Sequence, residues 1–202
     1  MLLIAYWWTW FRHDGEAGNS RLRQTLVVSV IGVIVALGLS VPMSLASYGR
    51  PIHANVLPRL PFGVSPETTN THPAFPSHHA LVAFVLVAGL FMASRVTGIV
   101  AAIYSLAIIG APQVYVGRHY PTDILGGALL GIAVVGVLNV SAIRTAIGAH
   151  PVAFAARRPA IFYAVAFIVT LQIGTLFDDA FPFVHLLGGV LRALHPQAGG
   201  IS

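Results

Sequence analysis

Long runs of apolar residues, almost free of charge, constrain this chain more than any other feature. A helix needs about 20 mostly apolar residues to cross a membrane, and several runs approach that length. Hydrophobic residues make up 56% of the 202-residue chain and charged residues 8%, whereas ordinary soluble domains carry about 25% charged residues. A soluble protein of this size could not bury so much apolar surface. We therefore expect an all-α protein, a polytopic helical bundle that lies mostly in lipid.

Four runs are good candidates for transmembrane helices, and a fifth is rich in small residues. The four lie at about 25–47, 79–93, 96–116 and 159–176. The fifth, 123–140, contains Gly126, Gly127 and Gly131, which suit close helix packing, although overall composition explains them equally well. Ahead of these runs stands a stretch of 11 residues, MLLIAYWWTWF, whose tryptophans suit a membrane interface. We predict a short first helix there, with an interfacial helix as the alternative, and about six transmembrane helices in all.

The basic residues indicate an orientation. All 11 are arginines, and together they give a net charge of +5. Because they are scattered between the apolar runs, anionic lipid head groups explain them better than nucleic acid does. If the connections alternate between the two sides, seven arginines fall on one side and four on the other. The arginine-rich side is expected to face the cytoplasm, which leaves the connections 48–78 and 117–122 facing the periplasm or exterior.

The remaining segments are expected to be connections within one membrane-embedded domain, 1–202. We predict loops at 12–23 and 141–158 and a tight turn at 94–95. The end of the chain, 177–202, contains an amphipathic stretch that we expect to lie on the membrane surface. Cysteine is absent, which excludes disulfides and cysteine metal sites.

Polar residues suited to chemistry gather at the ends of the predicted helices on the outer side. These pieces are Arg50-Pro51 after the second run, Pro76-Ser77-His78-His79 before the third, and Gly117 to Asp123 between the fourth and fifth. Ionisable groups at such positions in a membrane protein are functional candidates. We expect the folded bundle to bring the three pieces together at one interface.

Ser77 is a natural cap for the start of a helix, and Pro76 is tolerated in a first turn. A helix that begins there directs free N–H groups at the loop, which makes an anion site. Ser77 and these amides are candidates to hold a phosphate, with His79 as a proton donor. A capped helix with interfacial histidines is the alternative interpretation.

His119 and Asp123 are four residues apart. If Pro121 opens the next helix, Asp123 lies in its first turn and can accept a hydrogen bond from one imidazole nitrogen. The other nitrogen is then free to act as a nucleophile. Asp123 as a simple stabiliser of the helix N-terminus remains the alternative. Arg50 and Arg118 are candidates to clamp a phosphoryl group, although a lone arginine in a loop is more often a membrane anchor.

In order and spacing, these pieces resemble the type 2 phosphatidic acid phosphatase superfamily, whose signature is KxxxxxxRP, then PSGH, then SRxxxxxHxxxD. The RP pair is Arg50-Pro51, PSGH reads PSHH from Pro76, and HxxxD runs from His119 to Asp123. The resemblance covers about residues 43–127. Within the superfamily, FPSHHALVAF and the long loop before it look most like bacterial undecaprenyl diphosphate phosphatases of the bacitracin-resistance type.

The resemblance implies a membrane lipid phosphatase whose helical core is like that of the vanadium haloperoxidases, with no metal and no other cofactor. His119 would be the nucleophile that forms a phosphohistidine, Asp123 would orient it, and His79 would protonate the leaving group. The phosphate ligands would be Arg50, Ser77 and the backbone near His78, and we add Arg118 to them.

The expected reaction converts undecaprenyl diphosphate to undecaprenyl phosphate in the bacterial inner membrane, with the site facing the periplasm or exterior. Phosphatidylglycerophosphate, phosphatidic acid and lipid A phosphates remain open as substrates, as does phosphoryl transfer to another lipid. The expected partner is the lipid substrate in the bilayer. No nucleic-acid partner is expected.

Two cations of the signature are missing. Its lysine should fall at Met43, and the third-motif arginine should fall at Gln113. Arg118 or Arg59 would have to compensate for them. Because these two cations are missing, the main alternative is a weakly active or non-catalytic relative that binds lipid phosphates.

The histidines also admit a third interpretation, a transporter or a metal site. The loop and its end hold His53, His72, His78 and His79. Few carboxylates accompany them, so we expect no metal.

Overall fold

The computed structural model describes residues 1–12, 19–47 and 75–175. The chain divides into two compact units, Met1–Pro159 and Ala160–Ser202. Arg50, Arg59 and the predicted surface tail at 177–202 lie outside the described residues. The prediction of one domain therefore remains a prediction.

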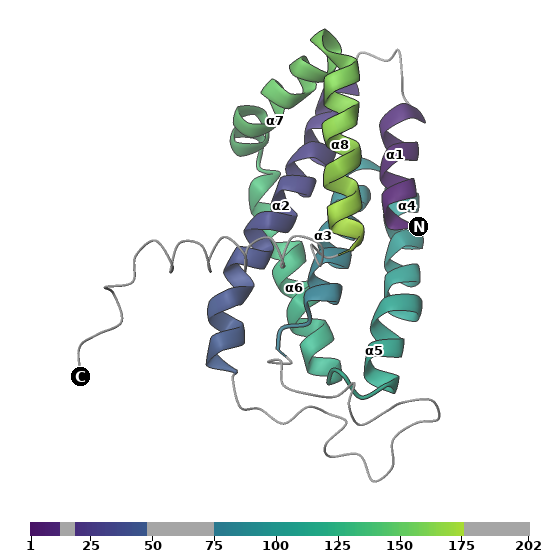
Figure 1. The fold of residues 1–202 in the computed structure, drawn as a ribbon, viewed down its shortest axis with the longest axis vertical. Coiled ribbons are helices and arrows are strands. Elements are labelled where there is room, and N and C mark those ends of the chain that lie inside the picture. The colour runs from purple at the N-terminus through teal and green to yellow at the C-terminus, as the bar shows by residue number, and fades with distance from the viewer. Residues whose placement is uncertain (13–18, 48–74, 176–202) are drawn as a thin grey trace, which may run out of the picture. The chain divides into compact units, whose positions relative to one another are not determined.

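The described residues are helical and contain no strand, which confirms the predicted all-α class (Figure 1). In chain order the elements are α1 Leu2–Arg12, α2 Asn19–Ala46, α3 His78–Ala93, α4 Arg95–Tyr104, the π-helical turn η3 Ser105–Gly110, α5 Ala111–Tyr115, α6 Pro121–Leu138, α7 Ser141–Arg157 and α8 Pro159–Gly174. Because α4, η3 and α5 form one continuous helix, the six predicted apolar helices are all present, the first one short.

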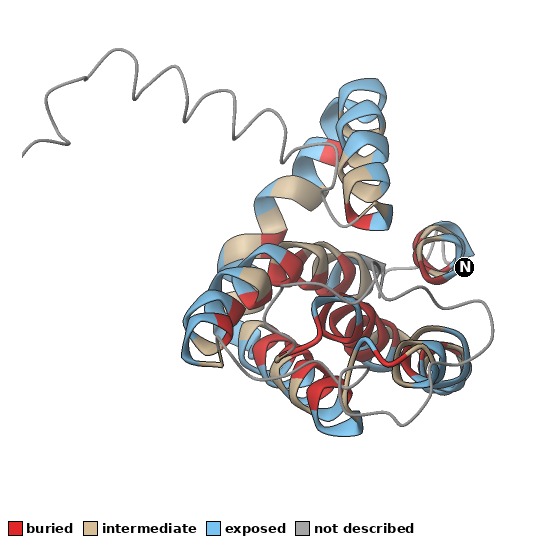
Figure 2. Ribbon diagram, turned by 60° about the horizontal axis from the view of Figure 1, so that its bottom comes forward, coloured by how far each residue is buried: buried red, intermediate tan, exposed pale blue. Residues whose placement is uncertain are grey.

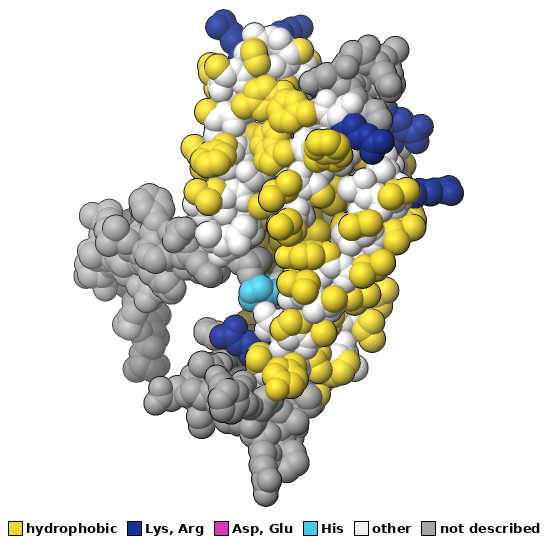
Figure 3. All heavy atoms as spheres, turned by 90° about the vertical axis from the view of Figure 1, so that its right-hand side faces the viewer, with side chains coloured by type: hydrophobic (Ala, Val, Ile, Leu, Met, Phe, Trp, Pro, Cys, Tyr) yellow, Lys and Arg dark blue, Asp and Glu magenta, His cyan; other side chains and the backbone are white. Residues whose placement is uncertain are grey.

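Three of these helices are long and apolar enough to cross a membrane. They are Ser20–Ala46, Arg95–Tyr115 and Pro121–Leu138. The helices α3 and α8 are apolar but shorter, with 16 residues each. Large apolar side chains such as Ile34, Val96 and Leu129 are exposed on the outside of the first unit, and hydrophobic side chains cover much of the face in Figure 3. This is the surface of a multi-pass membrane protein, in which lipid takes the place of water.

Helix α3 is the centre of the first unit. Every residue from Ala80 to Leu90 is buried, and α1, α2, α4 and α6 pack against it. A helix that is apolar on all sides belongs in the interior, and α3 carries no polar side chain after His79. The surrounding helices turn their buried residues toward it and their exposed residues outward (Figure 2).

Two glycines allow α6 to approach α3 closely. A Cβ atom on Gly127 would lie 2.5 Å from the carbonyl oxygen of Ser77, and one on Gly131 would lie 2.7 Å from that of Leu81. The ring of Phe75 lies against Gly126 in the same way. These contacts favour close packing over mere composition as the reason for the three glycines, with Gly127 and Gly131 against the backbone at α3 and Gly126 against the segment before it.

The prediction of a loop at 141–158 is wrong, because α7 occupies most of that segment. Six of its 17 residues are alanine, which has the highest helix propensity, and Gly148 packs against Gln24 of α2. Arg144 and Pro151 interrupt the apolar residues of this segment, so it contains no long apolar run that would predict a helix. The predicted loop at 12–23 is also too long, since α2 begins at Asn19.

Candidate functional site

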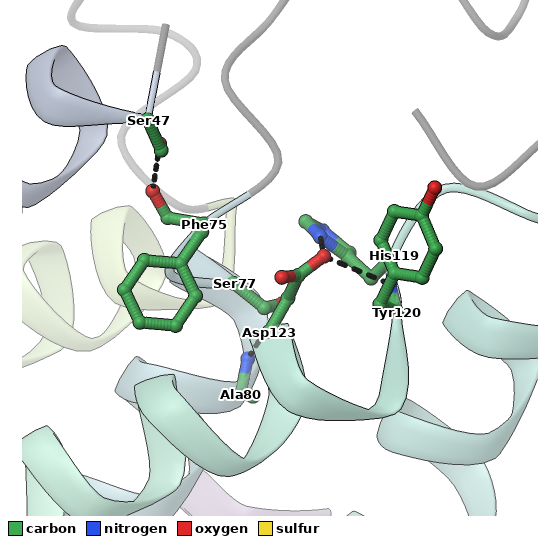
Figure 4. A network of polar contacts seen from close by, with 7 residues as sticks. All are labelled: Ser47, Phe75, Ser77, Ala80, His119, Tyr120 and Asp123. Atoms are coloured by element: carbon green, nitrogen blue, oxygen red, sulfur yellow. Dashed lines mark hydrogen bonds and ion pairs between the residues drawn. The ribbon is translucent and has the colours of Figure 1, made fainter. Parts of the chain in front are cut away.

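Several helix ends meet at one end of the first unit. The start of α3 is joined to the start of α6 by the N–H of Ser77, which donates to the carbonyl oxygen of Asp123 at 3.1 Å. The end of α2 is joined to the segment before α3 by the hydroxyl of Ser47, which donates to the carbonyl oxygen of Phe75 at 2.9 Å. As Figure 4 shows, this arrangement brings Ser77, at the start of α3, close to His119 and Asp123, which lie just before and within the first turn of α6.

Ser77 caps helix α3, as the sequence predicts. Its backbone is extended, and its Oγ accepts a hydrogen bond from the N–H of Ala80 at 3.5 Å. Ser77 is fully buried, and a cis peptide bond joins Phe75 to Pro76 just before it. His78 and His79 are the first two residues of α3, and both are exposed. The first N–H groups of a helix have no partner within the helix, so this end offers donors to an anion.

Asp123 is the third residue of α6, which Pro121 opens as predicted. Its carboxylate is fully buried. The Oδ2 atom accepts a hydrogen bond from the N–H of Tyr120 at 2.8 Å and lies 3.8 Å from Nδ1 of His119, whose side chain is 15% exposed. Asp123 therefore stabilises the start of α6, and its carboxylate also faces the imidazole, so its role in orienting His119 remains a prediction.

The turn between α5 and α6 determines where His119 lies. Gly117 has a φ of 74°, a left-handed conformation that glycine adopts without strain. Its N–H donates to the carbonyl oxygen of Val114 at 3.0 Å, and the N–H of Arg118 donates to that of Gln113 at 3.1 Å. This pair of hydrogen bonds is a Schellman motif. The motif is not among the features predicted above, although a glycine just after an apolar helical run is its usual signal.

Gln113, which stands where the signature has arginine, and Arg118, a candidate to compensate for it, both lie at this turn. The carbonyl oxygen of Gln113 also accepts the N–H of His119, at 3.2 Å. The side-chain Oε1 of Gln113 is buried and has no hydrogen-bond partner within the described residues. Arg118 is exposed. Arg50 follows Ser47 by three residues in the chain, outside the described residues.

Within residues 1–12, 19–47 and 75–175, no group of three or more His, Cys, Asp or Glu residues could hold a metal ion. Asp123 is the single acidic residue in those ranges. His53 and His72 lie outside them, so the expectation of a site without metal remains a prediction.

Comparisons with known proteins agree with the motifs. A family model described as the PAP2 superfamily matches residues 25–147. The chain is also similar to the bacitracin transport permease protein BcrC of Bacillus licheniformis, with 30% identity over 131 residues. That match covers 64% of this chain and 58% of the relative's length. No solved structure gives a significant match. The resemblance drawn from the motifs is therefore confirmed at the level of the superfamily and the bacitracin-resistance type.

Proposed function

Because the chain belongs to the PAP2 superfamily, a family of membrane lipid phosphatases, we propose that it hydrolyses undecaprenyl diphosphate to undecaprenyl phosphate and inorganic phosphate. The pairing of His119 with Asp123 beside the capped start of α3 carries the proposal. The choice of this substrate rests on the resemblance of FPSHHALVAF and the loop before it to undecaprenyl diphosphate phosphatases of the bacitracin-resistance type, and the chain is also similar to a protein named for bacitracin transport, BcrC.

In the first step, Nε2 of His119 attacks the terminal phosphorus and the P–O bond to the lipid monophosphate breaks. Asp123 faces Nδ1 at 3.8 Å, so it orients the imidazole and stabilises the positive charge that develops there. A contact of this length in the free protein is expected to tighten when substrate binds. His79 donates a proton to the departing oxygen. In the second step, His79 takes a proton from water, which attacks the phosphohistidine and releases phosphate.

The phosphate is held by neutral donors and arginines. Ser77, the backbone N–H of His78 and the positive end of the α3 dipole supply the neutral part. Arg118 is exposed beside His119, and Arg50 follows Ser47 along the chain. Arginine suits this role because its planar guanidinium binds two phosphate oxygens at once. In this mechanism the chain's own residues balance the charge without a cofactor.

The arginines support an orientation in which the site faces the periplasm or cell exterior. Of the arginines in the described residues, Arg118 alone is a chain neighbour of His119. The others belong to helix ends and connections away from it and are Arg12, Arg21, Arg23, Arg95, Arg144, Arg157 and Arg158. In Figure 3 most arginine side chains lie toward the end of the molecule away from the histidine in view. Arginine-rich connections remain in the cytoplasm. In a bacterial inner membrane, the diphosphate then enters from the outer aqueous side while its lipid tail remains in the bilayer.

The test measures phosphate release from undecaprenyl diphosphate by detergent-purified protein in EDTA, for the wild type and for His119→Ala. We expect release by the wild type and none by the variant. Phosphate release that continues in His119→Ala would refute the role of His119 as the nucleophile. Release that EDTA abolishes would favour a metal site. If the wild type releases no phosphate from this substrate, phosphatidic acid or phosphatidylglycerophosphate, the proposed activity is wrong.

Gln113 favours a second function, a non-catalytic relative that binds lipid phosphates. Its amide is neutral where the family signature has arginine, and the chain has no lysine. A binding protein would retain affinity for undecaprenyl phosphate without turnover. The phosphatase remains the better proposal, because a binding protein has no need of a histidine paired with a buried carboxylate.

A further inference from the structure

The hydroxyl of Ser47 connects helix α2 to the candidate site. Ser47 directly follows α2, and its hydroxyl lies 3.0 Å from the carbonyl oxygen of Ser44 within the same turn. It also donates to the carbonyl oxygen of Phe75 at 2.9 Å. The second contact joins residues 28 positions apart in the sequence, so it fixes the end of α2 to the segment that leads into α3.

That segment is held on its other side by α6. The ring of Phe75 lies against Gly126, and a Cβ atom there would collide with it. Two residues later, the N–H of Ser77 donates to the carbonyl oxygen of Asp123 at 3.1 Å. Figure 4 shows Ser47, Phe75, Ser77 and Asp123 in this order across the site. The cap of α3 is therefore clamped between α2 and α6.

We propose that Ser47 is a positioning residue, which through Phe75 holds the Ser77 cap and the first turn of α3 against the His119–Asp123 pair. The inference rests on the proposed function, in which a phosphate bound near Ser77 must meet Nε2 of His119. Misplacement of reacting groups by about 1 Å can cost roughly 100-fold in rate. Ser47 does not touch the substrate in this role, so its loss affects kcat more than KM.

Helix α2 provides a matched control. The hydroxyl of Ser40 donates to the carbonyl oxygen of Leu37 at 2.7 Å, a bond that stays within the helix. Ser40 is fully buried, and no contact joins its hydroxyl to the segment before α3 among the described hydrogen bonds. Ser40→Ala removes the same chemical group from the same helix without cutting a connection to the site.

The first experiment compares Ser47→Ala, Ser47→Thr and Ser40→Ala in the full-length protein, with phosphate release from undecaprenyl diphosphate as the assay. Ser47→Ala is expected to lower kcat about tenfold with KM changed by less than about twofold. Ser47→Thr keeps a hydroxyl and should recover most of kcat, and Ser40→Ala should match the wild type. An unchanged kcat in Ser47→Ala, an equal loss in Ser40→Ala, or a rise in KM alone overturns the inference.

Hydrogen exchange at backbone amides 75–81 gives a second measurement that needs no turnover. Ser47→Ala should speed exchange at the N–H of Ser77, which is bound to Asp123, and Ser40→Ala should leave it unchanged. If the wild type releases no phosphate from any lipid tested, the proposed function fails while this measurement still decides the positioning role. Equal exchange at Ser77 in the wild type and Ser47→Ala overturns the inference.

Discussion

Replacing Gly127 by alanine tests whether the contact between α3 and α6 is as close as described. The new Cβ atom would lie 2.5 Å from the carbonyl oxygen of Ser77 and 3.0 Å from the backbone nitrogen of Leu81. Ordinary van der Waals contact begins near 3.4 Å, so the two helices would have to separate by nearly 1 Å. Both opposing atoms are backbone atoms, one in the cap of α3 and one in its first turn, and backbone cannot turn aside as a flexible side chain would.

Overpacking of this kind typically costs about 1–3 kcal/mol. Gly136 of the same helix is the matched control, because a Cβ atom added there meets nothing within 4 Å. Alanine favours a helix over glycine by up to about 1 kcal/mol, so Gly136→Ala should leave the stability unchanged or slightly raised. Gly127→Ala gains the same helix propensity, so the cost of its overpacking appears as a difference from Gly136→Ala. At about 2–4 °C per kcal/mol for a domain of this size, the midpoint of thermal unfolding of Gly127→Ala should lie roughly 2–12 °C below that of Gly136→Ala.

The assay is thermal unfolding of the purified protein in one detergent, with both variants measured beside the wild type. Gly127→Ala should also lose phosphatase activity, since it displaces the residue that caps α3. Equal midpoints for Gly127→Ala and Gly136→Ala would refute the close approach of α6 to Ser77 and, with it, the account of how the site is assembled.

Three further predictions concern the chemistry. Asp123→Asn should lower kcat by roughly 10³-fold or more, because an amide does not stabilise the charged imidazole. Its unfolding midpoint should fall less than that of Asp123→Ala, because only the alanine variant loses the hydrogen bond from the N–H of Tyr120. Equal effects of the two variants on kcat and on stability would make Asp123 a structural residue only. Gln113→Arg should tighten inhibition by inorganic phosphate about tenfold, since a charge-assisted hydrogen bond replaces a neutral one; an unchanged inhibition constant would place position 113 away from the phosphate. Arg118→Ala should reduce kcat/KM by roughly 10–100-fold through the loss of one such contact, and unchanged turnover would count against its role.

The sequence predicts most of the fold because the apolar runs are long and their ends are marked. Ser77 and Pro121 begin helices as expected, and the predicted apolar helices agree with the described ones to within a few residues, except at the start of α2. Helix α7 was not foreseen, since it is rich in alanine rather than strongly apolar. Membrane proteins can contain helices that no search for apolar spans will find.

The candidate site is only partly predictable. The pairing of His119 and Asp123 can be predicted from their local spacing. The two residues are four positions apart, and Pro121 begins a helix between them. The contact between Ser47 and Phe75 has no local signal, since 28 positions separate the two residues. Sequence alone also could not decide whether Gly126, Gly127 and Gly131 serve packing, because that depends on which helix lies opposite.

The central position of α3 has a consequence for how the protein responds to its bilayer. With 16 residues the helix is about 24 Å long, shorter than the hydrocarbon core of about 30 Å. Because it is buried from Ala80 to Leu90, its neighbours rather than lipid cover this mismatch. A thicker or thinner membrane acts first on the tilt of the outer helices that touch it. The relation of Ser77 to Asp123 is set inside the protein, so it should persist across lipids of different acyl chain length.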